Sequence, residues 1–205
     1  MVQWGDRIVL AGNFTEVQDD NGTLHDVTYI VAYDIDTGLV DTSFMPEFDR
    51  SITALAVSAD GQHLFAAGLF NTVNGASRRK LVKLNQNGVV DGDFIANANA
   101  RASALAVSSD GSTVYAGGFF ATVNGVDRGL LAELDAETGD VGPLDLPITE
   151  GIGVRGTLKV QSLLLTPDDE TLVVVHTGNR VDGEVRQGAA VIDLTTRSLS
   201  PWQTD

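Results

Sequence analysis

The chain has 205 residues, of which 43% are hydrophobic and 22 are glycine, which is enough for a buried core with many tight turns. Its 13 Lys and Arg against 28 Asp and Glu give a net charge of −15, which argues against nucleic-acid binding because phosphate backbones require clustered cations. Cysteine is absent, so disulfides contribute nothing, and no apolar run approaches the ~18 residues of a membrane-spanning helix.

The N-terminal segment is predicted to form strands separated by a long hairpin. Asp6–Phe14 is an apolar run typical of a strand, and the hairpin Gln18–Thr28 separates it from a second strand at Tyr29–Tyr33. Asp41–Phe44 is expected to form a short last strand. Trp4-Gly5 stands at the position of a turn in the later units, so we expect this first unit to lack its inner strand.

The segment Ser51–Leu84 recurs fifty residues later as Arg101–Leu134, with roughly half of the positions identical, and a period near fifty is typical of a repeat architecture. In each copy an inner strand rich in alanine ends at an Asp-Gly turn, and a second apolar strand is followed by an Asn-Gly turn. A third, more polar strand such as Lys80–Leu84 follows, and a fourth short one such as Val89–Phe94 completes the unit.

A fourth, degraded unit follows the glycine-rich interruption Thr149–Thr157. Leu163 and Leu165 hold the inner-strand positions, but the Gly-x-Phe element of the other units is replaced by His176-Thr177-Gly178. Helical periodicity is absent from the whole sequence. The strands expected in this unit are Leu158–Leu165, Leu172–Val175, Gly188–Leu194 and Ser198–Trp202.

Antiparallel strands that become more polar from first to last are typical of a propeller blade. We therefore expect an all-β fold, a single β-propeller domain over residues 1–205 made of four blade-like four-stranded antiparallel repeats. The expected blades cover about residues 4–48, 51–98, 101–148 and 158–205. Because the first unit lacks an inner strand and neither end carries a polar cap, we expect an incomplete part of a larger propeller, completed by further blades or by self-association at open edges.

Three phrases carry a resemblance to a known repeat. They are Ala-Leu-Ala-Val-Ser-x-Asp-Gly, present twice, Gly-Gly-Phe-Phe-Ala-Thr-Val-Asn-Gly-Val-Asp-Arg, and Leu-Ala-Glu-Leu-Asp-Ala-Glu-Thr-Gly. The chain resembles bacterial β-propeller repeats of the delta-sixty type, within the broader YVTN and WD-like group. This resemblance implies a secreted or cell-surface multidomain protein without a shared catalytic residue. The Trp-Asp ending of WD blades is missing, so a eukaryotic-style scaffold function is not implied.

Two short motifs formally match ligand sites. The run from Gly151 to Gly156 satisfies G-x-G-x-x-G, but a strand follows it where a dinucleotide site requires a helix, so it is interpreted as a loop. Asp19, Asn21 and Asp26 offer oxygen ligands of the kind that calcium prefers, but their spacing does not match an EF-hand. We expect an elongated hairpin tip there.

The other polar candidates are predicted to be structural. A residue that follows the third strand of each unit is interpreted as a turn former, and the histidines stand at non-equivalent positions. Arg78 and Arg128 follow the Asn-Gly turns at the same offset, and this repetition favours packing or pairing between blades over anion binding. No Gly-x-Ser-x-Gly elbow is present, so we predict no catalytic, cofactor-binding or metal-binding residue. The turn formers are Asp34, Asn85, Asp135 and Asp193, and the histidines are His25, His63 and His176.

These observations favour a non-catalytic binding or structural module of a larger bacterial extracellular or cell-surface protein. Its partners would be other protein modules or a surface ligand. An alternative is a propeller-type lyase or lactonase with a site in the channel, but the inner strands carry Ala, Leu, Val, Ser and Thr where acidic or His side chains would be needed. A third is a carbohydrate- or peptide-binding surface on the longer loops Gln18–Thr28, Thr149–Thr157 and Thr177–Gly188.

Overall fold

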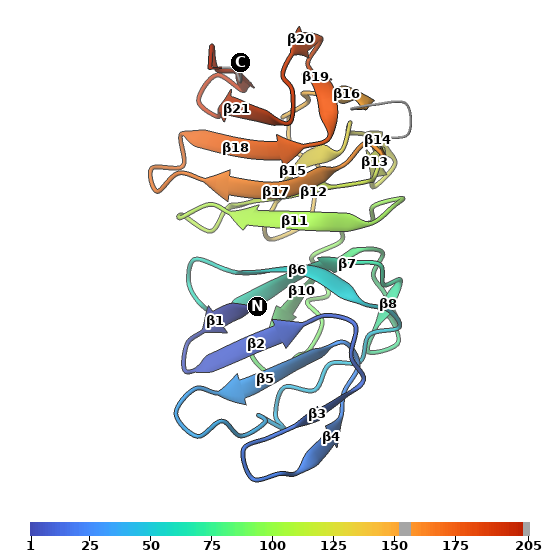
Figure 1. Ribbon diagram of the computed structural model, residues 1–205, viewed down its shortest axis with the longest axis vertical. Coiled ribbons are helices and arrows are strands. Elements are labelled where there is room, and N and C mark those ends of the chain that lie inside the picture. The colour runs from blue at the N-terminus through green and yellow to red at the C-terminus, as the bar shows by residue number, and fades with distance from the viewer. Residues whose placement is uncertain (152–156, 203–205) are drawn as a thin grey trace.

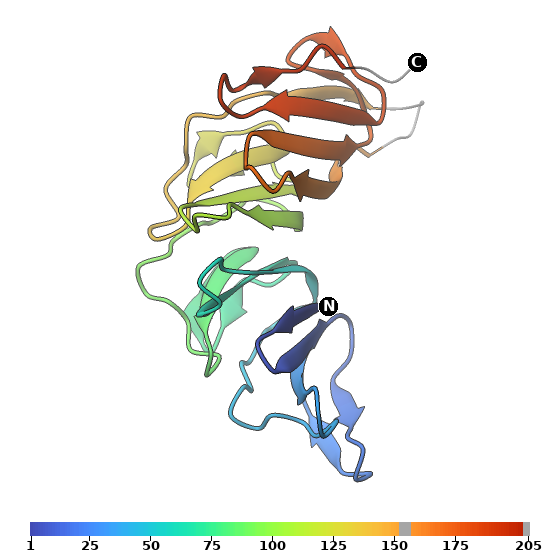
Figure 2. The same ribbon diagram turned by 90° about the vertical axis from the view of Figure 1, so that its left-hand side faces the viewer.

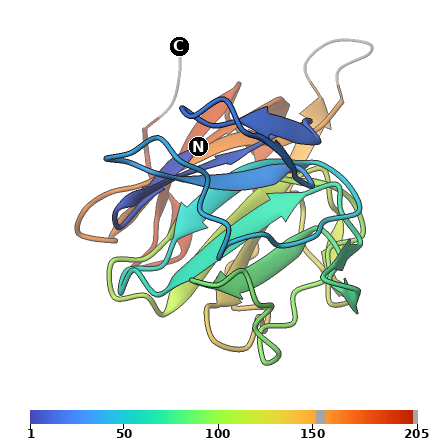
Figure 3. The ribbon, with the colours of Figure 1, turned by 90° about the horizontal axis from the view of Figure 1, so that it is seen from below.

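Four small antiparallel sheets follow one another along the chain and stack into an open arc (Figures 1 and 2). The computed structural model describes residues 1–151 and 157–202, and every regular element among these residues is a β-strand. Viewed from the blade 1 end, the sheets overlie one another (Figure 3). Blades 1 and 4 lie at opposite ends of the arc, so the described chain is an open propeller segment and not a closed ring (Figure 2).

Each blade is one sheet whose strands are numbered outward from the inner strand. Blade 1 contains β1 (Val2–Trp4), β2 (Arg7–Ala11) and β5 (Ile30–Asp34); blade 2 contains β6 (Ile52–Val57), β7 (His63–Gly68) and β10 (Leu81–Asn85); blade 3 contains β11 (Ala102–Val107), β12 (Thr113–Gly118) and β15 (Leu131–Asp135); and blade 4 contains β17 (Val160–Leu165), β18 (Thr171–His176), β21 (Ala189–Asp193) and β22 (Ser198–Leu199).

A small satellite sheet accompanies each blade, and its hairpin is inserted between the second and third strands of that blade. In blade 4 this sheet also contains β16, which precedes the inner strand. In blades 2 and 3 the segment that leads into the blade forms a bridge to this hairpin, Phe48 to Val73 and Ala98 to Val123. The satellite sheets are β3 (Glu16–Gln18) with β4 (Leu24–Asp26), β8 (Thr72–Val73) with β9 (Ala76–Ser77), β13 (Thr122–Val123) with β14 (Val126–Asp127), and β16 (Ile148–Gly151) with β19 (Gly178–Val181) and β20 (Glu184–Val185).

Blades 2 and 3 have the same strand register, which confirms that the two best copies of the unit form matching sheets without a helix. Val57 faces Leu64 in blade 2 as Val107 faces Val114 in blade 3. The inner strand of each carries a register shift at its start, and blade 4 repeats it between Val160 and Ser162. A β-bulge at a fixed place bends each inner strand in the same way.

The prediction that the first unit lacks an inner strand is wrong. Val2–Trp4 forms β1 and pairs antiparallel with β2, so the edge of β2 is covered. The strand holds with three residues because Trp4 anchors it: the indole packs edge-on against Phe44, with ring centroids 5.7 Å apart, and its Nε1 donates to the Gly61 carbonyl at 2.7 Å. The Trp side chain is thus shared between blades 1 and 2.

The outermost strand of blades 1 to 3 is reduced to a single bridge, such as Leu84 to Val90, whereas blade 4 keeps β22. In blade 2 the reason lies in the residue that follows the bridge at Val90. Asp91 Oδ1 accepts the Asp93 N–H at 2.9 Å, a local turn that competes with strand pairing. The turn directs Phe94 into the core, where it is 1% exposed.

The core consists of apolar layers between successive sheets. We call the side of a blade that looks toward the next blade its C-terminal face, and the opposite side its N-terminal face. Phe70 and Phe120 are fully buried and occupy equivalent places beside blades 2 and 3. Burying one such ring contributes about 1.5–3 kcal/mol relative to exposing it.

The N-terminal face of blade 1 has no preceding blade in the described chain, but it is not bare. Val17 and Val27, from the long hairpin, cluster with Val31 and Tyr33 of β5, and Val31 is fully buried. The Tyr33 hydroxyl donates to the Gln18 carbonyl at 3.2 Å. The expectation that this end lacks a cap is therefore wrong, because the hairpin β3–β4 packs against it with polar residues facing solvent.

Candidate binding surfaces

The predicted turn formers make the expected turns. Asp34 Oδ1 accepts the Thr37 N–H at 2.8 Å, and Asn85 Oδ1 accepts the Asn87 N–H at 2.9 Å. Asp135 and Asp193 do the same with the residues two and three positions on. Hydrogen bonds from a nearby threonine lower the pKa of each of the three carboxyls below its usual value. The series stabilises turns, as predicted.

The acidic hairpin of blade 1 satisfies its own carboxylate. Asp19 Oδ1 accepts the N–H groups of Asn21 and Thr23 at 3.0 and 2.9 Å, and Oδ2 lies 2.9 Å from His25 Nε2. The His25 hydrogen bond lowers the pKa of Asp19. Asp26 lies at the other end of the hairpin, where its backbone pairs with that of Glu16 across the two strands. Among residues 1–151 and 157–202, no three acidic or histidine side chains gather as a metal site would require.

The three histidines lie in different blades. His25 contacts Asp19, and His63 begins β7. His176 ends β18 and is 2% exposed, with Nδ1 accepting the Gly178 N–H at 3.0 Å. Burial lowers its pKa, so the neutral imidazole is favoured. Of the G-x-G-x-x-G run, Gly151 closes β16 opposite Gly178, and residues 152–156 lie outside the described part of the chain.

The recurrent arginines act within their own blades, so the predicted pairing between blades is wrong. Arg78 Nη2 donates to the Asp91 carbonyl at 3.0 Å and Arg128 Nη2 to the Gly142 carbonyl at 2.8 Å. Arg186 repeats this contact in blade 4, with the Ser200 carbonyl at 3.1 Å. Each guanidinium fastens the end of the hairpin to the outer edge of its sheet. Sequence reasoning missed Arg186 because the fourth unit lacks the Asn-Gly turn that marks the offset.

Contacts between blades follow a repeated plan at the inner strands. Thr53 Oγ1 of blade 2 donates to the Ala102 carbonyl of blade 3 at 2.7 Å, and Ser103 Oγ of blade 3 donates to the Val160 carbonyl of blade 4 at 2.8 Å. Both donors sit at the inner-strand bulge. In blade 4 the same position is held by Gln161, whose side chain is exposed.

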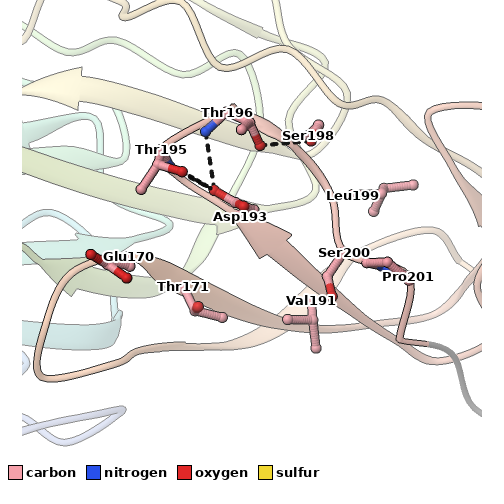
Figure 4. Close-up of a pocket in the computed structure, with 10 residues that line it drawn as sticks. All are labelled: Glu170, Thr171, Val191, Asp193, Thr195, Thr196, Ser198, Leu199, Ser200 and Pro201. Carbon is pink, nitrogen blue, oxygen red and sulfur yellow. Dashed lines mark hydrogen bonds between the residues drawn. The ribbon is translucent and has the colours of Figure 1, made fainter.

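The C-terminal face of blade 4 is uncovered and apolar. Leu164 is 64% exposed and Val175 39% exposed, and Val173 and Val191 are half-buried beside them. A pocket of about 390 Å³ opens toward the outer edge of the same sheet (Figure 4). In it the Asp193 carboxylate accepts hydrogen bonds from Thr195 and Thr196. Its lining is Glu170, Thr171, Val191, Asp193, Thr195, Thr196, Ser198, Leu199, Ser200 and Pro201.

A second pocket, of about 530 Å³, lies at the junction of blades 2 and 3. It is formed by the hairpin β8–β9 with its two flanking segments and by the segment leading into blade 3. Two adjacent cations, Arg79 and Lys80, line it, together with the amide side chains of Asn71 and Asn99. It is a basic pocket on a strongly acidic chain.

Stacked four-stranded or three-stranded antiparallel blades with a shared register define a β-propeller repeat protein. A family model described as "Domain of unknown function (DUF5122) beta-propeller" matches residues 59–94, which include β7, β8, β9 and β10. Among solved structures, one titled "Structure of U3-55K" aligns at 17% identity and a TM-score of 0.48 over 76% of this chain. The aligned part spans 41% of that structure's chain. The search of curated proteins found no match. No described residue belongs to a helix able to cross a membrane.

Proposed function

We propose that this chain is a non-catalytic binding and structural β-propeller module of a larger bacterial extracellular or cell-surface protein. We place its main contact at the C-terminal face of blade 4, with a further blade of the same repeat type as the occupant. The resemblance to delta-sixty repeats supports the bacterial and extracellular assignment. The uncovered face of blade 4 supports the contact.

The observation that carries the proposal is the apolar composition of that face. In blade 2, Phe65 and Ala67 of the second strand are 2% and 0% exposed because blade 3 covers them. Val173 and Val175 hold the equivalent places in β18, and nothing in the described chain covers them. Leu164 stands where the inner strands of blades 2 and 3 have alanine. Large exposed apolar patches mark interaction surfaces in folded proteins.

The occupant follows from continuity with the existing interfaces. A blade docks when its inner-strand carbonyl accepts a hydrogen bond from the bulge residue of the preceding blade, as Ala102 and Val160 do. Gln161 presents an amide donor at this same place in blade 4. The partner surface is therefore the N-terminal face of a blade, with aliphatic side chains such as Leu64 and Val82 of blade 2.

A single-cysteine experiment tests this contact, because the chain has no cysteine of its own. Val175→Cys is expected to react with a maleimide in the isolated 205-residue chain and to be protected in the complete native polypeptide. Val185→Cys is the control, since Val185 is 50% exposed on the β20 hairpin and should react in both. Equal labelling of position 175 in both would refute the proposal. Protection that rises with the concentration of the isolated chain would instead identify a second copy as the occupant, and would also overturn it.

A further inference from the structure

The basic pocket between blades 2 and 3 has a lining in which the hydrogen-bond acceptors are already used. Asn99 Oδ1 accepts the backbone N–H groups of Ala121 and Thr122 at 2.9 and 3.1 Å. Asn71 Oδ1 accepts from Lys80 Nζ at 2.7 Å. These donors fix the orientation of both amides, so the groups left for a ligand are the two Nδ2 amide NH2 donors. Such a pocket favours a ligand rich in oxygen acceptors.

The positive charge of the pocket is only partly offset, because Asp49 is the one carboxylate among the described residues whose charge acts on Lys80. Lys80 Nζ donates to neutral oxygens, the Leu69 carbonyl at 2.9 Å and Asn71 Oδ1. Burial and the neighbouring charge of Arg50 lower the pKa of Lys80. Arg79 has an exposed guanidinium without a carboxylate partner in the described chain.

The nearby carboxylate, Asp49, is largely committed to the backbone. Its Oδ1 accepts the N–H groups of Asn71 and Thr72 at 2.7 and 3.0 Å. Its Oδ2 lies 4.0 Å from Arg50 Nε, at the limit of an ion pair, and the Arg50 side chain is 61% exposed. An anion in the pocket would thus meet the exposed guanidinium of Arg79 and the fixed charge of Lys80. Arg50 adds positive charge close to Lys80.

The fold itself does not require these cations, because the same backbone occurs elsewhere without them. At the junction of blades 3 and 4, Gly129 and Leu130 stand in place of Arg79 and Lys80, and Ala100 in place of Arg50. Leu130 has the same left-handed backbone as Lys80, with φ of 75° and 73°. At the junction of blades 1 and 2 the equivalent pair is Thr28 and Tyr29. The cationic lining is specific to one junction.

Two further cations, Arg101 and Lys159, stand just before the inner strands of blades 3 and 4. Arg101 follows Asn99 by two residues, so their Cα atoms lie within about 7 Å of one another. The Arg101 guanidinium stacks 4.0 Å from the centroid of Phe119, and Lys159 Nζ lies 5.8 Å from the same ring. Stacking on Phe119 holds the guanidinium of Arg101 in place.

We propose that this pocket binds an acidic sugar, with the carboxylate or sulfate group held by Arg79, the positive charges of Lys80 and Arg50 close by, and the sugar oxygens facing the asparagine amide NH2 groups. The volume of 530 Å³ falls within the range of about 300–1,000 Å³ of small-molecule sites. A bare inorganic anion would leave most of it empty. A peptide side chain would find little apolar lining, which consists of Ala98 and aliphatic stems. A polymer of acidic sugars would extend from the pocket toward Arg101 and Lys159.

Isothermal titration calorimetry at low ionic strength tests this site, with trigalacturonate, its neutral methyl ester, galactose 6-sulfate and sodium sulfate as probes. At least one acidic sugar is expected to bind and the ester is expected not to bind; the two acidic probes separate the carboxylate from the sulfate source. The double variant Arg50→Gln, Arg79→Gln should weaken binding at least tenfold. Arg180→Gln removes an arginine that already pairs with Glu150 at 3.0 Å, and should leave binding unchanged.

Several results would overturn the proposal. One is binding of the ester as tight as that of the acid, and another is unchanged binding in the double variant. Sodium sulfate binding as tightly as either acidic sugar would show an adventitious ion only. Tighter binding of hexaglutamate than of either acidic sugar would assign the pocket to an acidic peptide and refute the sugar. Both substitutions are at exposed side chains whose counterparts in blade 3 are Ala and Gly, so the variants are expected to fold. The pocket is separate from the blade 4 face, and its test is independent of the maleimide experiment.

Discussion

Removing the side chain of Asn124 should loosen the attachment between the hairpin β13–β14 and the segment that leads into blade 3. Asn124 Oδ1 accepts the Asn97 N–H at 2.8 Å, and Nδ2 donates to the carbonyls of Ile95 and Gly139 at 2.8 and 3.2 Å. Its backbone is left-handed, with φ of 51°. One side chain therefore joins three segments that are far apart in the sequence.

The contribution of the three hydrogen bonds and the steric cost of the left-handed backbone can be separated by the choice of substitution. Asn124→Gly keeps the left-handed backbone without strain and deletes the three hydrogen bonds, each worth about 0.5–1.5 kcal/mol. Because Asn124 is exposed, we expect the free energy of unfolding to fall by about 2 kcal/mol. Asn124→Ala deletes the same bonds and adds the steric cost of a left-handed non-glycine residue, about 1–2 kcal/mol more. Asn74→Gly in blade 2 deletes two side-chain bonds, to Glu47 N–H and the Gly88 carbonyl, and should cost less, about 1 kcal/mol.

Urea unfolding followed by circular dichroism measures these differences through the midpoint, provided that the slope m is unchanged. The expected order of stability is wild type, then Asn124→Gly, then Asn124→Ala. A glycine variant as stable as the wild type would show that the three hydrogen bonds contribute nothing net. An alanine variant no less stable than the glycine variant would show that the left-handed backbone relaxes without cost.

Three further predictions concern titration, packing and ions. Burial lowers the pKa of His176 in the folded protein, so the unfolded chain binds a proton more readily below about pH 6.5. Stability should therefore fall as the pH decreases from there toward the folded pKa. His176→Phe should remove that part of the decrease in urea midpoints between pH 7 and 5. Gly117→Val should destabilise the protein by about 1–3 kcal/mol because Val160 of blade 4 packs against the glycine backbone. Val175→Ala, at the same strand position on the uncovered face of blade 4, should change stability by no more than about 0.5 kcal/mol. Equal effects would contradict the assigned faces. Millimolar calcium should move the melting temperature by no more than a few degrees, because the protein's own donors occupy the Asp19 carboxylate; a larger rise, reversed by EDTA, would reveal a site there.

The basic pocket shows how far the sequence can lead toward a site. Arg78 is the residue that repetition brings to notice, and the structure uses it to fasten the sheet edge. The adjacent Arg79 and Lys80 have no cationic counterpart in the other units, and this departure from the repeat is the signal that could have found them. Arg50 departs from the repeat as well, since Ala100 stands in its place, but the repeat does not show that it lies near Lys80. Its proximity to Lys80 results from the fold of blade 2 and not from sequence spacing.

The sequence by itself determined the turns and the second and third strands of the repeated units, because alternation of apolar residues and Asp-Gly or Asn-Gly turns act through local backbone geometry. It also determined that the units are copies of one another, since repeated residues build repeated registers. It did not determine the inner strand β1 or the reduction of the outermost strands to single bridges. Tertiary structure alone decided which apolar faces are buried. Val173 and Tyr115 hold equivalent places in their strands, yet Tyr115 is buried beneath blade 4 and Val173 belongs to an uncovered face. Burial is a property of two neighbouring sheets, and one strand's pattern does not record whether a neighbour is present.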